Sequence, residues 1–151
     1  MAVNINRRKL LVGGLAAGLV LNVIDFLSNA VILASRMQAD ANAFKPGLGD
    51  QMANMGGEQI AVYVFFDFVV GFLLVWTYAA IRPRFGPGPL TSAYVGSLFF
   101  VFGLILTFGY KELGVMTPGL WWMYTGIWFV NLMLASFVGG LLYSEEGSQT
   151  A

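Results

Sequence analysis

Four long apolar stretches constrain this chain more than any other feature. They cover about residues 10–33, 60–81, 90–108 and 121–143, and each is close to the roughly 20 residues that a helix needs to cross a bilayer. All four are too long for ordinary strands. Because unpaired backbone cannot face lipid, helices are the spanning structure that remains. The sequence therefore predicts one all-α domain over residues 1–151, an integral membrane bundle of four transmembrane helices.

The composition supports a membrane protein and excludes several functional classes. Apolar residues make up 58% of the chain and charged residues 11%, against about 25% charged residues in soluble domains. Eight basic and eight acidic residues cancel, so no net charge attracts nucleic acid. The chain has no cysteine and no histidine, which excludes thiolate and imidazole chemistry. We therefore expect no enzyme activity, cofactor or metal; the expected partners are membrane lipids and either other membrane proteins or further copies of this chain.

The distribution of basic residues predicts the topology. An even number of spans puts both termini on one side of the membrane, together with the second connection. That side carries five basic residues and the other side three; the five are Arg7, Arg8, Lys9, Arg82 and Arg84. Because basic residues concentrate on the cytoplasmic side, both termini are expected to be cytoplasmic. The longest loop, residues 34–59, is then non-cytoplasmic.

The connections differ in length and composition. Residues 34–59 contain Pro46 and four glycines, which predicts an irregular loop with at most one short interfacial turn. This loop also holds Met37, Met52 and Met55. Thioethers can bind soft metals, but scattered methionines are more typical of interfacial packing. Residues 82–89 contain three prolines and predict a short, stiff connection between antiparallel helices.

Small residues mark the faces on which the helices are expected to pack. Gly14 and Gly18 form a small-xxx-small pair in the first span, which permits close helix approach. In the third span, Gly96 and Gly103 lie on one face, two turns apart. The Gly14–Gly18 face continues into a polar stripe, and the opposite face of the helix is nearly all aliphatic.

That stripe begins a candidate intramembrane polar cluster. Asp25 and Asp67 lie at a similar height in the first and second spans, roughly 5 Å outside the midplane at about 1.5 Å per residue. Placing an aspartate near a helix centre costs about 2.5–3.5 kcal/mol on insertion scales. No lysine or arginine lies at this depth. The complete candidate cluster is Asn22, Asp25, Asn29, Asp67 and Asn131.

Two interpretations of the cluster remain open. In the first interpretation, Asp25 and Asp67 share a proton or bind a cation, as intramembrane acids often do. Alternatively, both are neutral acids that tie the helices together through hydrogen bonds to Asn22, Asn29 and Asn131. Such bonds contribute only about 0.6 kcal/mol each on average in membranes.

The segment YAAIRPRFGPGP at 78–89, with an Asn–Asp–Asn first span, resembles small four-span bacterial membrane proteins of unknown function. The resemblance implies the bacterial inner membrane as location and carries no activity. A second similarity is to small multidrug transporters, which also have four spans and one acid in the first span. Asp25 matches that acid in position, but the first loop here is much longer and Asp67 has no counterpart.

The sequence favours a non-enzymatic accessory or scaffolding subunit that associates with other membrane proteins. Four helices with short loops offer lipid-facing and protein-facing surfaces but little room for a catalytic site. The alternative is a small oligomeric transporter or channel, coupled to a proton or cation that binds Asp25 and Asp67.

Overall fold

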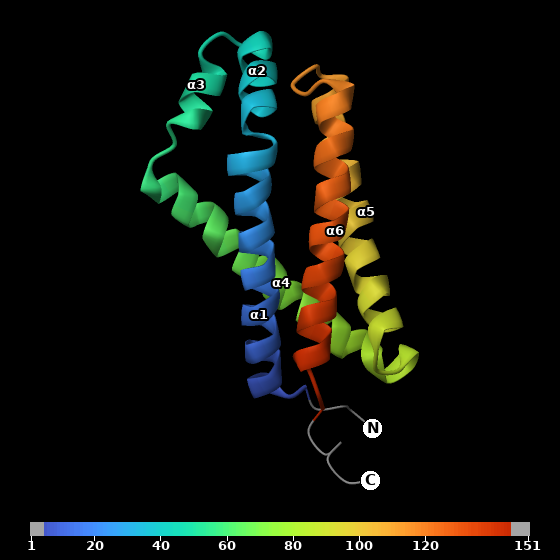
Figure 1. Cartoon of the computed structure of the whole chain (residues 1–151). Helices are drawn as coiled ribbons and strands as arrows, with labels where there is room; N and C mark the ends of the chain where they lie inside the picture. Colours follow the sequence, from blue (N-terminus) through green and yellow to red (C-terminus); the bar gives the residue numbers. More distant parts are fainter. Residues whose placement is uncertain (1–4, 146–151) are drawn as a thin grey trace.

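A computed structural model describes residues 5–145, and all regular secondary structure in this range is helical. These described residues form six α-helices with a five-residue π-helical segment, η1, between the first two (Figure 1). In chain order they are α1 (Arg7–Leu27), η1 (Ser28–Ile32), α2 (Ala34–Phe44), α3 (Leu48–Ala53), α4 (Gly57–Phe85), α5 (Pro89–Glu112) and α6 (Pro118–Leu142).

Four of these segments are long and apolar enough to cross a membrane, which confirms the all-α, four-span prediction. They are Arg7–Ile32, Gly57–Phe85, Pro89–Glu112 and Pro118–Leu142. The second, third and fourth helices extend beyond the predicted apolar stretches at one or both ends. Apolarity marks only the part of a helix that suits hydrocarbon, whereas caps and turns decide where the helix ends.

The predicted connection at 82–89 is partly wrong, because α4 continues through Pro83 to Phe85. Proline lacks one N–H and therefore costs the helix one backbone hydrogen bond at this point, but it does not end the helix. The chain reverses only at Gly86 and Gly88, whose φ angles are +83° and +125°. Glycine adopts such angles without steric penalty, so these two glycines, more than the prolines, make the turn.

The predicted irregular loop at 34–59 is wrong over most of its length. It forms α2 and α3, joined by a turn in which Gly47 has a φ of +83°. Alanine, methionine and glutamine make α2 a good helix former, and this propensity outweighs the loop signal of the surrounding glycines. The Asp50 carboxylate then fastens the two helices, accepting hydrogen bonds from Gln38 Nε2 at 2.9 Å and Asn42 Nδ2 at 3.3 Å.

These bonds predict a pH dependence for the α2–α3 pair. The amides of Gln38 and Asn42 lower the pKa of Asp50. The ionised carboxylate therefore stabilises the contact between α2 and α3 at every pH above the ordinary pKa of an aspartate. That stabilisation is lost as the pH falls through the lowered value. Because the chain lacks cysteine, spin labels can be attached at A39C and Q51C alone, both exposed positions. We expect the distribution of distances between the labels to stay narrow as the pH falls from neutral and to broaden below about pH 4.

The Asp50→Asn variant is the matched control for this experiment. Its side chain cannot titrate, so the label distance is expected not to change over the same pH range. A wild-type distance that remained narrow far below pH 4 would contradict the role given to Asp50.

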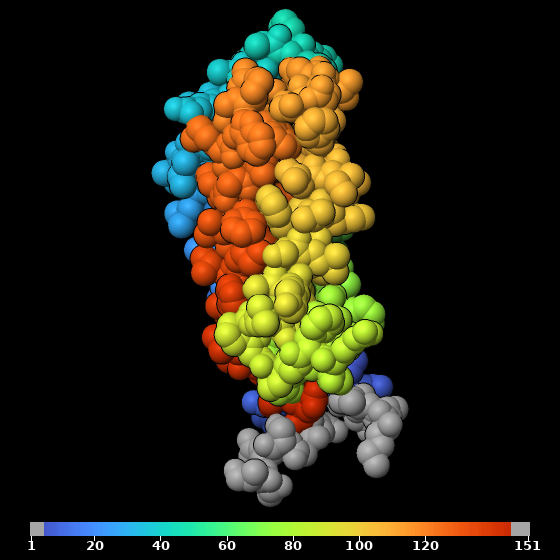
Figure 2. All heavy atoms as spheres, turned by 90° about the vertical axis from the view of Figure 1, so that its right-hand side faces the viewer, coloured from blue at the N-terminus to red at the C-terminus, as the bar shows by residue number. Residues whose placement is uncertain are grey.

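The four long helices form an elongated bundle in which α6 packs against α1, α4 and α5. Figure 1 shows α4 running obliquely behind α1, with its first turns leaning away from the other long helices. Figure 2 shows α5 and α6 side by side along the length of the molecule. The buried core lies between the helices and contains Ala17, Leu21, Leu74, Val75, Val95, Leu132 and Ala135.

Glycines allow the closest helix contacts. A Cβ on Gly71 would lie 2.7 Å from both the Gly14 oxygen and the Gly18 Cα, so α1 and α4 cross backbone to backbone at these three residues. Gly96 and Gly103 both lie in the α5–α6 contact, the first against Met133 and the second beneath the Trp128 ring. The four glycines expected to mediate packing therefore all face a neighbouring helix.

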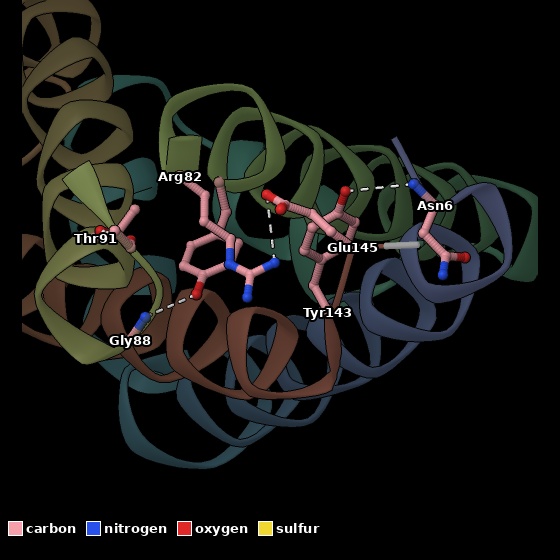
Figure 3. A network of polar contacts seen from close by, with 8 residues as sticks. Asn6, Arg82, Gly88, Thr91, Tyr143 and Glu145 are labelled. Atoms are coloured by element: carbon pink, nitrogen blue, oxygen red, sulfur yellow. Dashed lines mark hydrogen bonds and ion pairs between the residues drawn. The ribbon is translucent and has the colours of Figure 1, made fainter. Parts of the chain in front are cut away.

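A polar network joins the first and last described segments at the turn between α4 and α5 (Figure 3). Arg82 Nη1 lies 3.4 Å from Glu145 Oε1, and the guanidinium lies 5.8 Å from the centre of the Tyr143 ring. The Tyr143 hydroxyl accepts a hydrogen bond from the Asn6 backbone at 3.4 Å. Both ends of the bundle's chain therefore lie at one end of the molecule, as an even number of spans requires.

Candidate functional site

The candidate site forms where α1, α4 and α6 meet beyond the α1–α4 crossing. Asn131 of α6 has no exposed surface, and its amide nitrogen donates to Asp25 Oδ1 at 2.7 Å and to the Leu21 carbonyl at 3.4 Å. Its Oδ1 has no hydrogen-bond partner among the described residues. The amide therefore presents its donor side to the carboxylate and fixes the position of Asp25.

Asp67 of α4 lies beside Asp25, and the two carboxyl groups are close enough to interact. Both side chains are half-buried. Within residues 5–145, neither forms an ion pair with a lysine or arginine. Two carboxyl groups in contact need either a shared proton or a bound cation, because two bare carboxylates repel.

The pair lies on the wall of a cavity of about 670 Å³. Residues of α1, η1, α2, α3, α4 and α6 line it, together with Met55 and Met116 from two connections. Most of its lining is apolar, and Asp25 and Asp67 are its only charged lining residues within the described chain. The cavity therefore combines a localised negative site with apolar walls.

The other two candidate asparagines line the same cavity but do not bind the carboxyl groups. Asn22 Nδ2 donates to the Gly18 carbonyl at 2.9 Å and to the Val64 carbonyl of α4 at 3.4 Å. Asn29 is exposed, and its Nδ2 donates to the Asp25 backbone carbonyl at 2.8 Å. Amide side chains in helices readily bond to the carbonyl one turn earlier. Of the three predicted amides, Asn131 alone contacts an aspartate side chain.

The helix changes form one turn after Asp25, where α1 ends at Leu27. The π-helical segment η1 spans Ser28–Ile32, and the Ser28 hydroxyl donates to the Ile24 carbonyl. A π segment inserts an extra residue per turn and rotates the face that follows, and such segments are frequent at functional sites. Here it precedes α2, whose Met37 and Gln38 line the cavity.

Two contacts hold α2 against the start of α6. Arg36 Nη1 donates to the Met123 sulfur at 2.6 Å, and Asp40 Oδ2 accepts from the Thr117 backbone N–H at 2.7 Å. On the other side, Asp50 holds α3 to α2. These contacts fix the part of the cavity wall that lies farthest from the termini.

The polar cluster predicted from the sequence does not include several residues that line the cavity. Tyr63 and Tyr124 line the cavity, and Tyr124 is within electrostatic range of both aspartates. Their positions one and two turns from Asp67 and Asn131 on the same helix faces were a usable signal. Met116 gives no such signal, because only the tertiary structure brings its loop to the cavity.

Comparisons with models of protein families, with curated proteins and with solved structures find no match for this chain. The resemblances to small four-span bacterial membrane proteins and to small multidrug transporters therefore stay predictions.

Proposed function

We propose that this chain is a small, non-enzymatic inner-membrane protein of bacteria that transports a solute coupled to a proton or cation bound at Asp25 and Asp67. With the termini in the cytoplasm, the cavity lies toward the non-cytoplasmic end of the bundle. The observation that carries the proposal is the contact between two half-buried carboxyl groups at the wall of a 670 Å³ cavity.

The geometry supports exchange between a proton and another cation. The pair has no basic partner among the described residues, so its charge must be compensated by something that can leave. Asn131 occupies Oδ1 of Asp25, which leaves the remaining carboxyl oxygens for Asp67 and for an occupant of the cavity. A proton shared by the two acids and a cation that displaces this proton compete for the same negative charge of the pair.

Infrared spectroscopy of the full chain in nanodiscs tests the proposal. Difference spectra between acid and neutral buffer are expected to show the C=O stretch of a protonated carboxyl group that titrates. This band is expected to shift in both Asp25→Asn and Asp67→Asn, because one carboxyl group remains without its partner, and to disappear in the double variant.

The Asp50→Asn variant is the control, because Asp50 is an exposed carboxylate outside the pair and its loss should leave the band unchanged. Circular dichroism of each variant is the check that its helical content is unchanged. Persistence of the same titrating band in both variants of the pair would overturn the proposal.

A second candidate function is the accessory or scaffolding subunit that the sequence favours. The observation for it is that residues 57–66, the first part of α4, are all exposed, so this part of the helix is available to another membrane protein. Such a role requires no titrating pair. The same infrared spectra therefore separate the candidates, because a pair that does not respond to pH supports the accessory role.

A further inference from the structure

The cavity's charges restrict what it can bind. Asp25 and Asp67 are the only ionisable groups of either sign, other than tyrosine, among its described lining residues. No lysine or arginine lies there to bind an anion. Within the described residues, the Asp67 side chain has no hydrogen-bond partner other than Asp25. The electrostatics of the site therefore favour a cation over a neutral or anionic occupant.

The walls of the cavity are suited to an apolar body. Four methionines line it, from four different segments of the chain; they are Met37, Met52, Met55 and Met116. Thioether side chains are apolar, polarisable and flexible, and they adapt to ligands of varied shape. A hydrated inorganic ion would gain little from such walls, whereas an organic group would be desolvated against them.

Aromatic rings adjoin the carboxyl pair. Tyr63 and Tyr124 line the cavity, and Tyr124 is within electrostatic range of both aspartates. The face of an aromatic ring attracts ammonium groups, by about 0.5–2 kcal/mol. Rings and carboxyl groups that line one cavity are an arrangement that recognises a positively charged nitrogen.

Inorganic cations fit the site less well. Hard divalent ions take six or more oxygen ligands, and the described residues contain no group of three or more acidic, histidine or cysteine side chains that could hold a metal. A soft ion such as Ag(I) would use methionine sulfur alone and would give the carboxyl pair no part in binding.

We infer that the cavity binds an organic ammonium ion, whose charged nitrogen lies at Asp25 and Asp67 and whose apolar body lies against the methionines. This inference rests on the proposed function and names the chemical class of its solute. It requires both parts of the ligand: the charge for the carboxyl pair and the apolar body for the walls.

Three probes separate these requirements in equilibrium binding to the full chain in nanodiscs, with binding to empty nanodiscs subtracted. Benzyltrimethylammonium carries both charge and ring, tetramethylammonium the charge alone, and benzenesulfonate a ring with the opposite charge. We expect the first to bind roughly tenfold more tightly than the second, because its ring is buried as well. No binding of benzenesulfonate is expected.

Variants assign the two parts of the ligand to the two parts of the cavity. Asp25→Asn and Asp67→Asn should each weaken benzyltrimethylammonium binding by about tenfold or more. Met52→Ser, in α3 and outside the four long helices, should weaken that ligand about threefold and leave tetramethylammonium unaffected. A merely structural role for Met52 would change both ligands alike.

Two results would overturn the inference: binding of benzenesulfonate as tight as that of the ammonium ion, or ammonium binding retained in both aspartate variants. If the infrared band titrates as expected but no ammonium probe binds, the ligand class is wrong and the proton site stands. If the band is also independent of the aspartates, the proposed function itself is wrong.

Discussion

Replacing Gly71 by alanine is expected to separate α1 from α4 and to destabilise the bundle by about 3 kcal/mol, the upper end of the usual overpacking range. The new Cβ would lie 2.7 Å from the Gly14 oxygen and the Gly18 Cα. Both neighbours are backbone atoms, so no side-chain rotation can relieve the overlap. Unfolding in mixed micelles with increasing SDS content, followed by tryptophan fluorescence and circular dichroism, measures the loss.

Gly126→Ala is the matched control. Gly126 lies in the middle of α6, is exposed, and a Cβ there would meet nothing within 4 Å. Its replacement should therefore be neutral or stabilise the helix by up to about 1 kcal/mol. Equal effects of the two substitutions would show that the contact at Gly71 does not limit how closely the helices approach.

The Gly71 substitution should also disturb the site. Asp67 lies one helical turn from Gly71 on α4, and Asp25 lies two turns beyond Gly18 on α1. Widening the crossing therefore moves one carboxyl group relative to the other. We expect the infrared band of the pair to shift or vanish even in the fraction of Gly71→Ala protein that remains folded.

The double substitution Asp25→Asn/Asp67→Asn is expected to have the opposite effect on stability, raising it by about 2 kcal/mol while removing proton binding. Acidic groups at this depth, without a basic partner, are costly to keep in the membrane. Two amides are neutral and can hydrogen-bond to each other and to Asn131. The same unfolding titration at neutral pH measures the gain.

This prediction distinguishes a functional role of Asp25 and Asp67 from a role in holding the helices together. If the acids served only to tie α1, α4 and α6 together, their replacement would leave stability unchanged or lower it. The control is Asp40→Asn, which changes a carboxylate at the α2–α6 contact and leaves the pair intact. A drop in stability for the double variant greater than that for Asp40→Asn would contradict a functional origin of the pair.

The polar cluster was only partly predictable. Depth along each apolar stretch placed Asp25 and Asp67 at one height, because a helix rises by a fixed distance per residue. Depth and periodicity do not distinguish Asn22, Asn29 and Asn131 from one another. Helical periodicity gives the face of a side chain but not its partner, and the amides of α1 and η1 bond to their own or a neighbouring backbone.

The long loop was mispredicted because two local signals compete within it. Pro46 and the glycines indicate irregular chain, and they do mark the turns before α3 and α4. Between them, α2 follows α1 through η1, and Asp50, Asp40 and Arg36 hold it in place by contacts distant in sequence. Composition averaged over residues 34–59 hides this division.

The sequence by itself determined the membrane environment, the four helices and the acids they contain, since apolar length and unsatisfied backbone leave one solution in lipid. Only the tertiary structure decided that Asp25 meets Asp67, that Asn131 fixes Asp25, and that methionines from four segments line one cavity. Those features depend on how helices rotate and cross. That choice is made by contacts between residues far apart in the chain, above all at Gly14, Gly18 and Gly71.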